Sequence, residues 1–285
     1  MPDLAPSAYA RATIAELCEE ILRRSGTAGV IPTPLEAVEA AVGIRGRIDA
    51  PMPAVLRERV LGAVWFEERM LFVDTTQPRA RRRFTHAHEL AHVLCPWHEA
   101  VLRVDTAGEL FGRLATGIEA EANFGAAELI FQGSRFAVEA HQRERSLSTA
   151  FALGGRFGAS RQAAAHQYVS SHEGAVAMAI AGRWPGRDGR LPIWRSVESA
   201  SFLRRFGRFA AGLPSAGIDT RDRADAPFAA AVDAARRSSH PVSGRVQLSD
   251  RGGALRRFHA DVFNNRHCHL VFVAELSATR GAQPK

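Results

Sequence analysis

The spacing of apolar positions predicts a mainly helical first half. Apolar residues recur at helical spacing over residues 8–24, and Thr33-Pro34 begins a second helix, because proline suits the first turn. Apolar runs at residues 60–66 and 70–74, separated by charged residues, predict a β-hairpin. The same reasoning gives a strand over 42–48, and helices from about residue 78 to Cys95, over 117–132, and as a short pair over 146–172.

The pattern changes after residue 174, where short apolar strands alternate with loops rich in Gly, Pro and Arg. These strands are expected at residues 175–181, 191–194, 242–248, 258–263 and 269–276. The sequence therefore predicts an α+β fold in three parts. They are a mainly helical domain with a small sheet over 1–140, a helix-turn-helix-like segment over 141–173, and an α+β domain over 174–285.

Composition excludes a disordered or fibrous protein, since 46% of the 285 residues are hydrophobic and 24% are charged. Cys18, Cys95 and Cys268 lie far apart and form no CxxC pair, so we expect a reducing compartment. We see neither a signal-peptide pattern nor an apolar run of about 20 residues, which predicts a cytoplasmic protein without a membrane association. The net charge of +7 permits DNA or an acidic partner.

A metal-binding motif stands inside one predicted helix. Residues 88–92 read His-Glu-Leu-Ala-His, which is an HExxH motif. One helical turn separates His88 from His92, so both imidazoles can reach one ion, and Glu89 can accept the proton of a metal-bound water. The surrounding residues are apolar, and burying these three polar side chains without a partner would be costly. We therefore expect zinc, with manganese as an alternative, bound by His88 and His92, and Glu89 as the catalytic base.

A catalytic zinc needs a third protein ligand, and three residues compete for that role. His98 lies ten residues after His88, which is the spacing of the metzincin pattern HExxHxxGxxH, but Cys95 stands where that pattern has glycine. In the helix predicted over 117–132, Glu121 shares a stripe with Glu128 and Gln132 that we expect to be solvated. Glu119 lies on the stripe expected to point inward, so it is the favoured ligand, with Glu121 and His98 left open.

These residues resemble the ImmA/IrrE family of zinc metallopeptidases. Members of this family carry an HExxH motif and, like the gluzincins, use a glutamate as the third metal ligand. The resemblance is carried by the run from Arg83 to His92 and by Glu119, Asn123, Ala126 and Ala127. It implies a zincin-like domain with His88, His92 and Glu119 as ligands and Glu89 as general base. It also implies a stress-response or transcription regulator that cleaves an XRE-type repressor, and a GAF-like C-terminal domain that senses a signal or holds the substrate.

The helix-turn-helix-like segment supplies a rival function. Gly158 is expected in its turn and Ser160 at the cap of its second helix, which carries Arg161 and Gln162, residues able to read base edges. Direct DNA binding is expected to be weak. The alternatives to a peptidase are a DNA-binding regulator with a structural or vestigial metal site, and a metal-dependent toxin–antitoxin partner.

Overall fold

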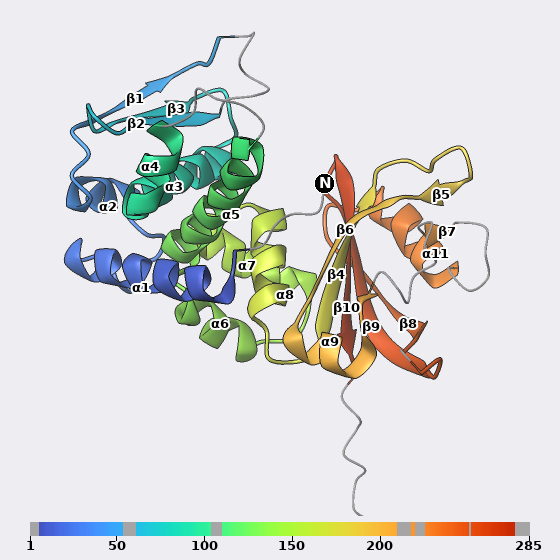
Figure 1. The fold of residues 1–285 in the computed structure, drawn as a ribbon. Coiled ribbons are helices and arrows are strands. Elements are labelled where there is room, and N and C mark those ends of the chain that lie inside the picture. The colour runs from blue at the N-terminus through green and yellow to red at the C-terminus, as the bar shows by residue number, and fades with distance from the viewer. Residues whose placement is uncertain are drawn as a thin grey trace, which may run out of the picture. The chain divides into compact units, whose positions relative to one another are not determined.

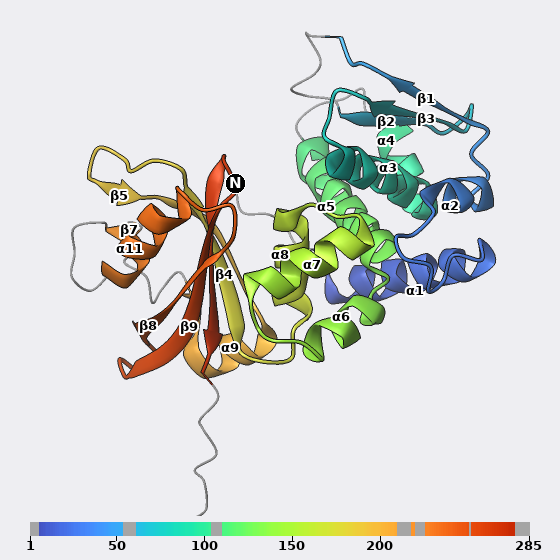
Figure 2. The same ribbon diagram turned by 180° about the vertical axis from the view of Figure 1, so that it is seen from behind.

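The computed structural model describes residues 6–53, 61–103, 110–209, 218–219, 226–250 and 252–276 (Figures 1 and 2). The chain divides into two compact units, and both are mixtures of helices and strands, which confirms the α+β class. Unit 1 contains residues 1–136 and 154–160, and unit 2 contains residues 137–153 and 161–285. The domain boundaries expected from the sequence stay predictions.

Unit 1 combines helices with a three-stranded sheet. Its elements are α1 (Ala8–Arg24), α2 (Leu35–Ala41), β1 (Gly46–Ala50), β2 (Gly62–Trp65), β3 (Met70–Asp74), α3 (Arg79–Leu94), α4 (Pro96–Arg103) and α5 (Leu110–Phe131). The strand order is β1-β3-β2, with β1 parallel and β2 antiparallel to β3. The predicted hairpin is therefore confirmed. The helix α4 is an addition, because Pro96 ends one helix and then begins the next.

The core of unit 1 forms where α3, α5 and α1 pack together (Figure 1). Gly125 lies at the crossing of α5 with α3, where a Cβ atom would stand 2.8 Å from Cβ of Ala91. Ala91 is fully buried, so the two small residues set how closely the helices approach. This close approach brings the first half of α5 beside the HExxH segment.

The end of α7 (Leu147–Phe157) also belongs to unit 1. The ring of Phe157 lies 5.2 Å from that of Phe136 and 6.1 Å from that of Phe131, measured between centroids. All three side chains are buried. Aromatic packing of this kind joins a late segment of the chain to the core of the first unit.

Unit 2 is built on a five-stranded antiparallel sheet in the order β6-β4-β10-β9-β8. Its elements, besides parts of α6 (Ser134–His141) and α7, are α8 (Arg161–Ser171), β4 (Val176–Gly182), β5 (Arg190–Leu191), β6 (Ile193–Glu198), α9 (Ala200–Phe206), β7 (Ile218–Asp219), α11 (Ala226–Ala235), β8 (Val242–Ser249), β9 (Leu255–Asn264) and β10 (Cys268–Glu275). The expected strands are thus present. The resemblance to a GAF domain stays a prediction.

Both faces of this sheet are covered, which explains why β4 is apolar and buried along its whole length. Val271 and Val273 share one apolar cluster with Phe202 of α9 and Phe228 of α11. On the opposite face, the ring of Phe272 meets Tyr168 of α8, with centroids 6.1 Å apart. Successive side chains of a strand point to opposite faces, so a central strand with two covered faces needs apolar residues at every position.

Candidate metal centre

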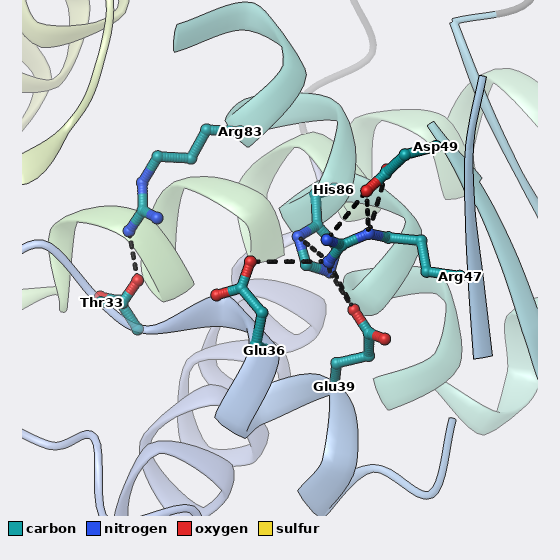
Figure 3. Close-up of polar contacts among 7 residues, drawn as sticks. All are labelled: Thr33, Glu36, Glu39, Arg47, Asp49, Arg83 and His86. Carbon is teal, nitrogen blue, oxygen red and sulfur yellow. Dashed lines mark hydrogen bonds and ion pairs between the residues drawn. The ribbon is translucent and has the colours of Figure 1, made fainter. Parts of the chain in front are cut away.

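The helix α3, which carries the HExxH motif, receives little support from its own first turn. Pro78 occupies the N-cap position without a side-chain hydrogen bond, and the first turn holds arginines and no acidic residue. Cations at a helix N-terminus oppose the helix dipole. Arg83 is partly buried, and its Nη2 donates to the carbonyl oxygen of Thr33 (Figure 3). Contacts with the rest of the unit therefore hold this helix.

An ionic network around His86 supplies more of that support (Figure 3). Arg47 of β1 donates to Glu39 of α2 at 2.8 Å and to Asp49 at 3.1 Å, and its Nη1 lies 3.2 Å from the ring nitrogens of His86. Nε2 of His86 lies 2.8 Å from Oε2 of Glu39. Burial, followed by the charge of Arg47, lowers the pKa of His86, which favours its neutral form. This network joins α2 and β1 to α3.

The three expected ligands converge. Nε2 of His88 and Nε2 of His92 are 3.1 Å apart, and the Glu119 carboxylate lies 3.1 Å from the first and 3.4 Å from the second. Among the described residues, these three make up the one group of histidine, cysteine or carboxylate side chains that could hold an ion. Burial favours a neutral Glu119, but hydrogen bonds from both imidazoles outweigh it and lower the pKa of its carboxyl far below the usual range.

The spacing of these atoms fits a divalent metal. Tetrahedral zinc bound at about 2.0–2.1 Å separates its ligand atoms by about 3.3–3.4 Å. The two imidazole nitrogens lie 3.1 Å apart, and the two oxygens of the Glu119 carboxylate lie 3.1 Å from one nitrogen and 3.4 Å from the other, which is close to that spacing. Three protein ligands also leave a fourth position for water or a substrate, which is the donor set of catalytic zinc sites.

Glu89 is buried beside this group of ligands, with 6% of its surface exposed. Burial raises the pKa of its carboxyl to about 7. Gly62 of β2 lies directly against it, since a Cβ atom there would stand 2.5 Å from both Oε1 of Glu89 and Cγ2 of Thr85. Sequence reasoning missed Gly62, although a glycine inside a predicted strand often marks a close approach.

Glu119 and Glu121 of α5 differ in exposure in the opposite sense to the one predicted from helical phase. Glu119, expected to point inward, has a side chain that is 51% exposed, and Glu121, expected in solvent, is only 18% exposed. Gln132, on the same predicted stripe, is half-buried, and its amide donates to the carbonyl oxygen of Val30 at 2.8 Å. Glu119 is thus close to both histidines at an open site, while Glu121 faces other protein groups.

His98 is fully buried and stands behind the ligands instead of among them. Its Nδ1 lies 3.0 Å from Nδ1 of His92, and its Nε2 lies 3.0 Å from Oε2 of Glu121. Nε1 of Trp97 donates to the same oxygen at 2.7 Å. Burial, the largest effect, lowers the pKa of His98 and so favours a neutral ring.

Arg161 and Gln162, which were expected to read DNA, contact other side chains of unit 2. The guanidinium of Arg161 lies over the rings of Phe151 and Phe263, at 5.4 and 5.0 Å from their centroids. Oε1 of Gln162 accepts a long hydrogen bond of 3.5 Å from Nδ2 of Asn265. These contacts use the start of α8 for packing.

Comparison with known proteins gives one family and one fold. Residues 55–168 match the model of the IrrE N-terminal-like domain, a peptidase family. No curated protein matches the chain. A solved structure of similar fold is a Mycobacterium tuberculosis transcriptional regulator, with 16% identity and a TM-score of 0.57 over 96% of this chain and 94% of that one. None of the described helices is long and apolar enough to cross a membrane.

Proposed function

Because residues 55–168 belong to the IrrE N-terminal-like family of metallopeptidases, we propose that this chain is a zinc-dependent endopeptidase that regulates transcription by cleaving a partner protein. The observation that carries the proposal is the convergence of His88, His92 and Glu119 beside the buried Glu89. The proposed partner is an XRE-type repressor, as the resemblance implies. Manganese is the alternative metal.

His88, His92 and Glu119 would hold the ion. A bound zinc ion supplies a Lewis acid that polarises a peptide carbonyl and lowers the pKa of water. Glu89 accepts a proton at its carboxylate and returns it to the leaving amine. Burial raises the pKa of this carboxyl, which makes its carboxylate a stronger proton acceptor than an exposed glutamate.

The strand β2 offers a place for an extended substrate. It lies at an edge of the β1-β3-β2 sheet and packs against α3, with Gly62 in contact distance of Glu89. In the described part of the chain, β2 pairs with β3 alone. A peptide added along the other edge would receive main-chain hydrogen bonds and pass beside the catalytic carboxylate.

The regulatory part of the proposal is supported by the family and by the name of the Mycobacterium tuberculosis structure, a transcriptional regulator of similar fold. The rival, direct reading of DNA by α8, is weakened by the packing of Arg161 and Gln162 within unit 2. The C-terminal domain would then sense a signal or hold the substrate.

The test is cleavage of an XRE-type repressor encoded beside this chain, by the purified chain with zinc or manganese. Glu89→Gln keeps the shape of the side chain and should lower the cleavage rate by about 10²–10⁴-fold, since it cannot accept a proton. Glu19→Gln makes the same change at an exposed site on α1 and should cleave at the parent rate. Glu119→Ala should lose the metal. Cleavage by Glu89→Gln at the parent rate would refute the assigned base.

A further inference from the structure

A chain of buried polar groups extends from the candidate ligand His92 into the protein. It runs from His92 through His98 to Glu121, with two contacts of 3.0 Å, and Trp97 adds a second donor to the same carboxylate oxygen. His98 is fully buried and His92 is 3% exposed. Buried imidazoles of this kind need partners for both nitrogens, because an unpaired polar atom loses the hydrogen bond it had with water.

When both rings are neutral, only one distribution of protons satisfies the contact between His92 and His98 together with the contact between His98 and Glu121. A carboxylate only accepts hydrogen bonds, so Nε2 of His98 must carry a proton and donate to Glu121. Nδ1 of His98 is then an acceptor, and Nδ1 of His92, 3.0 Å away, must donate to it. The proton on Nδ1 of His92 leaves its Nε2 with a free lone pair, and this atom faces His88 and Glu119.

We propose that His98 is a positioning residue which, together with Glu121 and Trp97, holds His92 in the tautomer and ring orientation that binds the metal. The inference rests on the proposed metal site and deepens it. The partner of a metal-bound histidine fixes the tautomer and raises the basicity of the ligand, and its loss typically costs about 10–100-fold in metal affinity.

The turn between α3 and α4 serves this arrangement. Cys95 has an extended backbone after the last residue of α3, and Pro96 begins α4 at once. The backbone N–H of His98 donates to the carbonyl oxygen of Cys95 at 2.9 Å. This tight turn places the ring of His98 against His92 of α3. Since protein groups engage both ring nitrogens, His98 supports a ligand without being one.

Variants of His98 separate positioning from simple packing. His98→Leu keeps the volume but offers no acceptor to His92, so zinc affinity should fall by about 10–100-fold in competition with a chelator. His98→Asn places an amide oxygen close to the position of Nδ1 and should restore affinity to within a few-fold of the parent. His269→Leu is the matched control: His269 is equally buried, in β10, and its loss should lower stability without changing zinc affinity.

A second measurement needs no variant. Nitrogen chemical shifts of the histidine rings in the zinc-loaded parent chain should show a proton on Nδ1 of His92 and on Nε2 of His98. A proton on Nδ1 of His98, or parent affinity in His98→Leu, would overturn the inference. A parent chain that binds zinc with these tautomers but cleaves no partner would refute the proposed function and leave His98 in its role. A parent chain that binds no zinc would overturn both.

Discussion

The crossing of α3 and α5 can be tested by adding a single methyl group. In Gly125→Ala the new Cβ would lie 2.8 Å from Cβ of Ala91, whereas carbon atoms in contact are normally about 3.5–4.0 Å apart. Overpacking of this kind typically costs about 1–3 kcal/mol. It opposes the gain of about 1 kcal/mol that alanine brings over glycine inside a helix. The expected net effect is a loss of up to about 2 kcal/mol in the free energy of unfolding.

The effect of Gly125→Ala on the free energy of unfolding should reverse its sign when Ala91 is replaced by glycine. In the Ala91→Gly background the nearest remaining side-chain atom is Cγ2 of Ile14, 3.3 Å away, so the severe overlap disappears. Gly125→Ala should then stabilise the chain by up to about 1 kcal/mol. Urea unfolding of the parent, both single variants and the double variant, in excess chelator, gives this coupling energy.

We expect a coupling of at least about 1 kcal/mol, well above the 0.3–0.5 kcal/mol or so within which independent sites add. Zinc affinity should fall in Gly125→Ala, because separating the helices moves Glu119 away from the histidines, and should recover in the double variant. The reasoning would be refuted if Gly125→Ala stabilised the parent chain as much as it stabilises Ala91→Gly.

Three further results are expected. Arg47→Met removes the ion-pair partner of the half-exposed Asp49 and of the partly buried Glu39, which keeps its contact with His86, and should lower stability by roughly 1–2 kcal/mol and the melting temperature by about 2–8 °C; an unchanged melting curve would contradict this. Burial lowers the pKa of His172 to about 4, so the unfolded chain binds more protons below pH 6.5 and stability falls as the pH falls toward 4. Urea midpoints of His172→Asn, which cannot be protonated there, should therefore depend less on pH over that range. Promoter and random DNA duplexes should bind weakly and equally, with strong salt dependence; a promoter preference above about 10³-fold, lost on mutating Arg161 and Gln162, would favour the DNA-binding function.

The helix that carries the HExxH motif could be predicted because the pattern that specifies it lies within a short stretch of sequence. Two histidines one turn apart among apolar residues specify both the helix and its chemistry, and the structure contains that helix as α3. Glu119 was predicted from burial, yet its side chain is half exposed. Helical phase gives the direction of a side chain, but the position of the neighbouring helix decides whether that direction is interior, and α4 covers Glu121 instead.

Contacts between distant segments could not be predicted from one sequence. The sequence predicted a helix end at Cys95, but Pro96, which follows it, also begins the next helix, and this second helix places His98 behind His92. The network of Glu39, Arg47 and His86 depends on the parallel pairing of β1 with β3, which no local pattern specifies. The position of Gly62 in a predicted strand indicates a close approach, but the sequence does not say that Glu89 is the residue that approaches it.

The course of the chain between its two compact units limits how the protein can be dissected. Residues 154–160 belong with residues 1–136, although residues 137–153 group with the C-terminal sheet. A fragment that ends at residue 140 would lack Phe157 and expose the aromatic rings of Phe131 and Phe136 to water. Loss of activity in such a fragment would therefore report a damaged core and not a requirement for the C-terminal domain. Fragments that extend through residue 168, where the family match ends, retain Phe157 and make the fairer comparison.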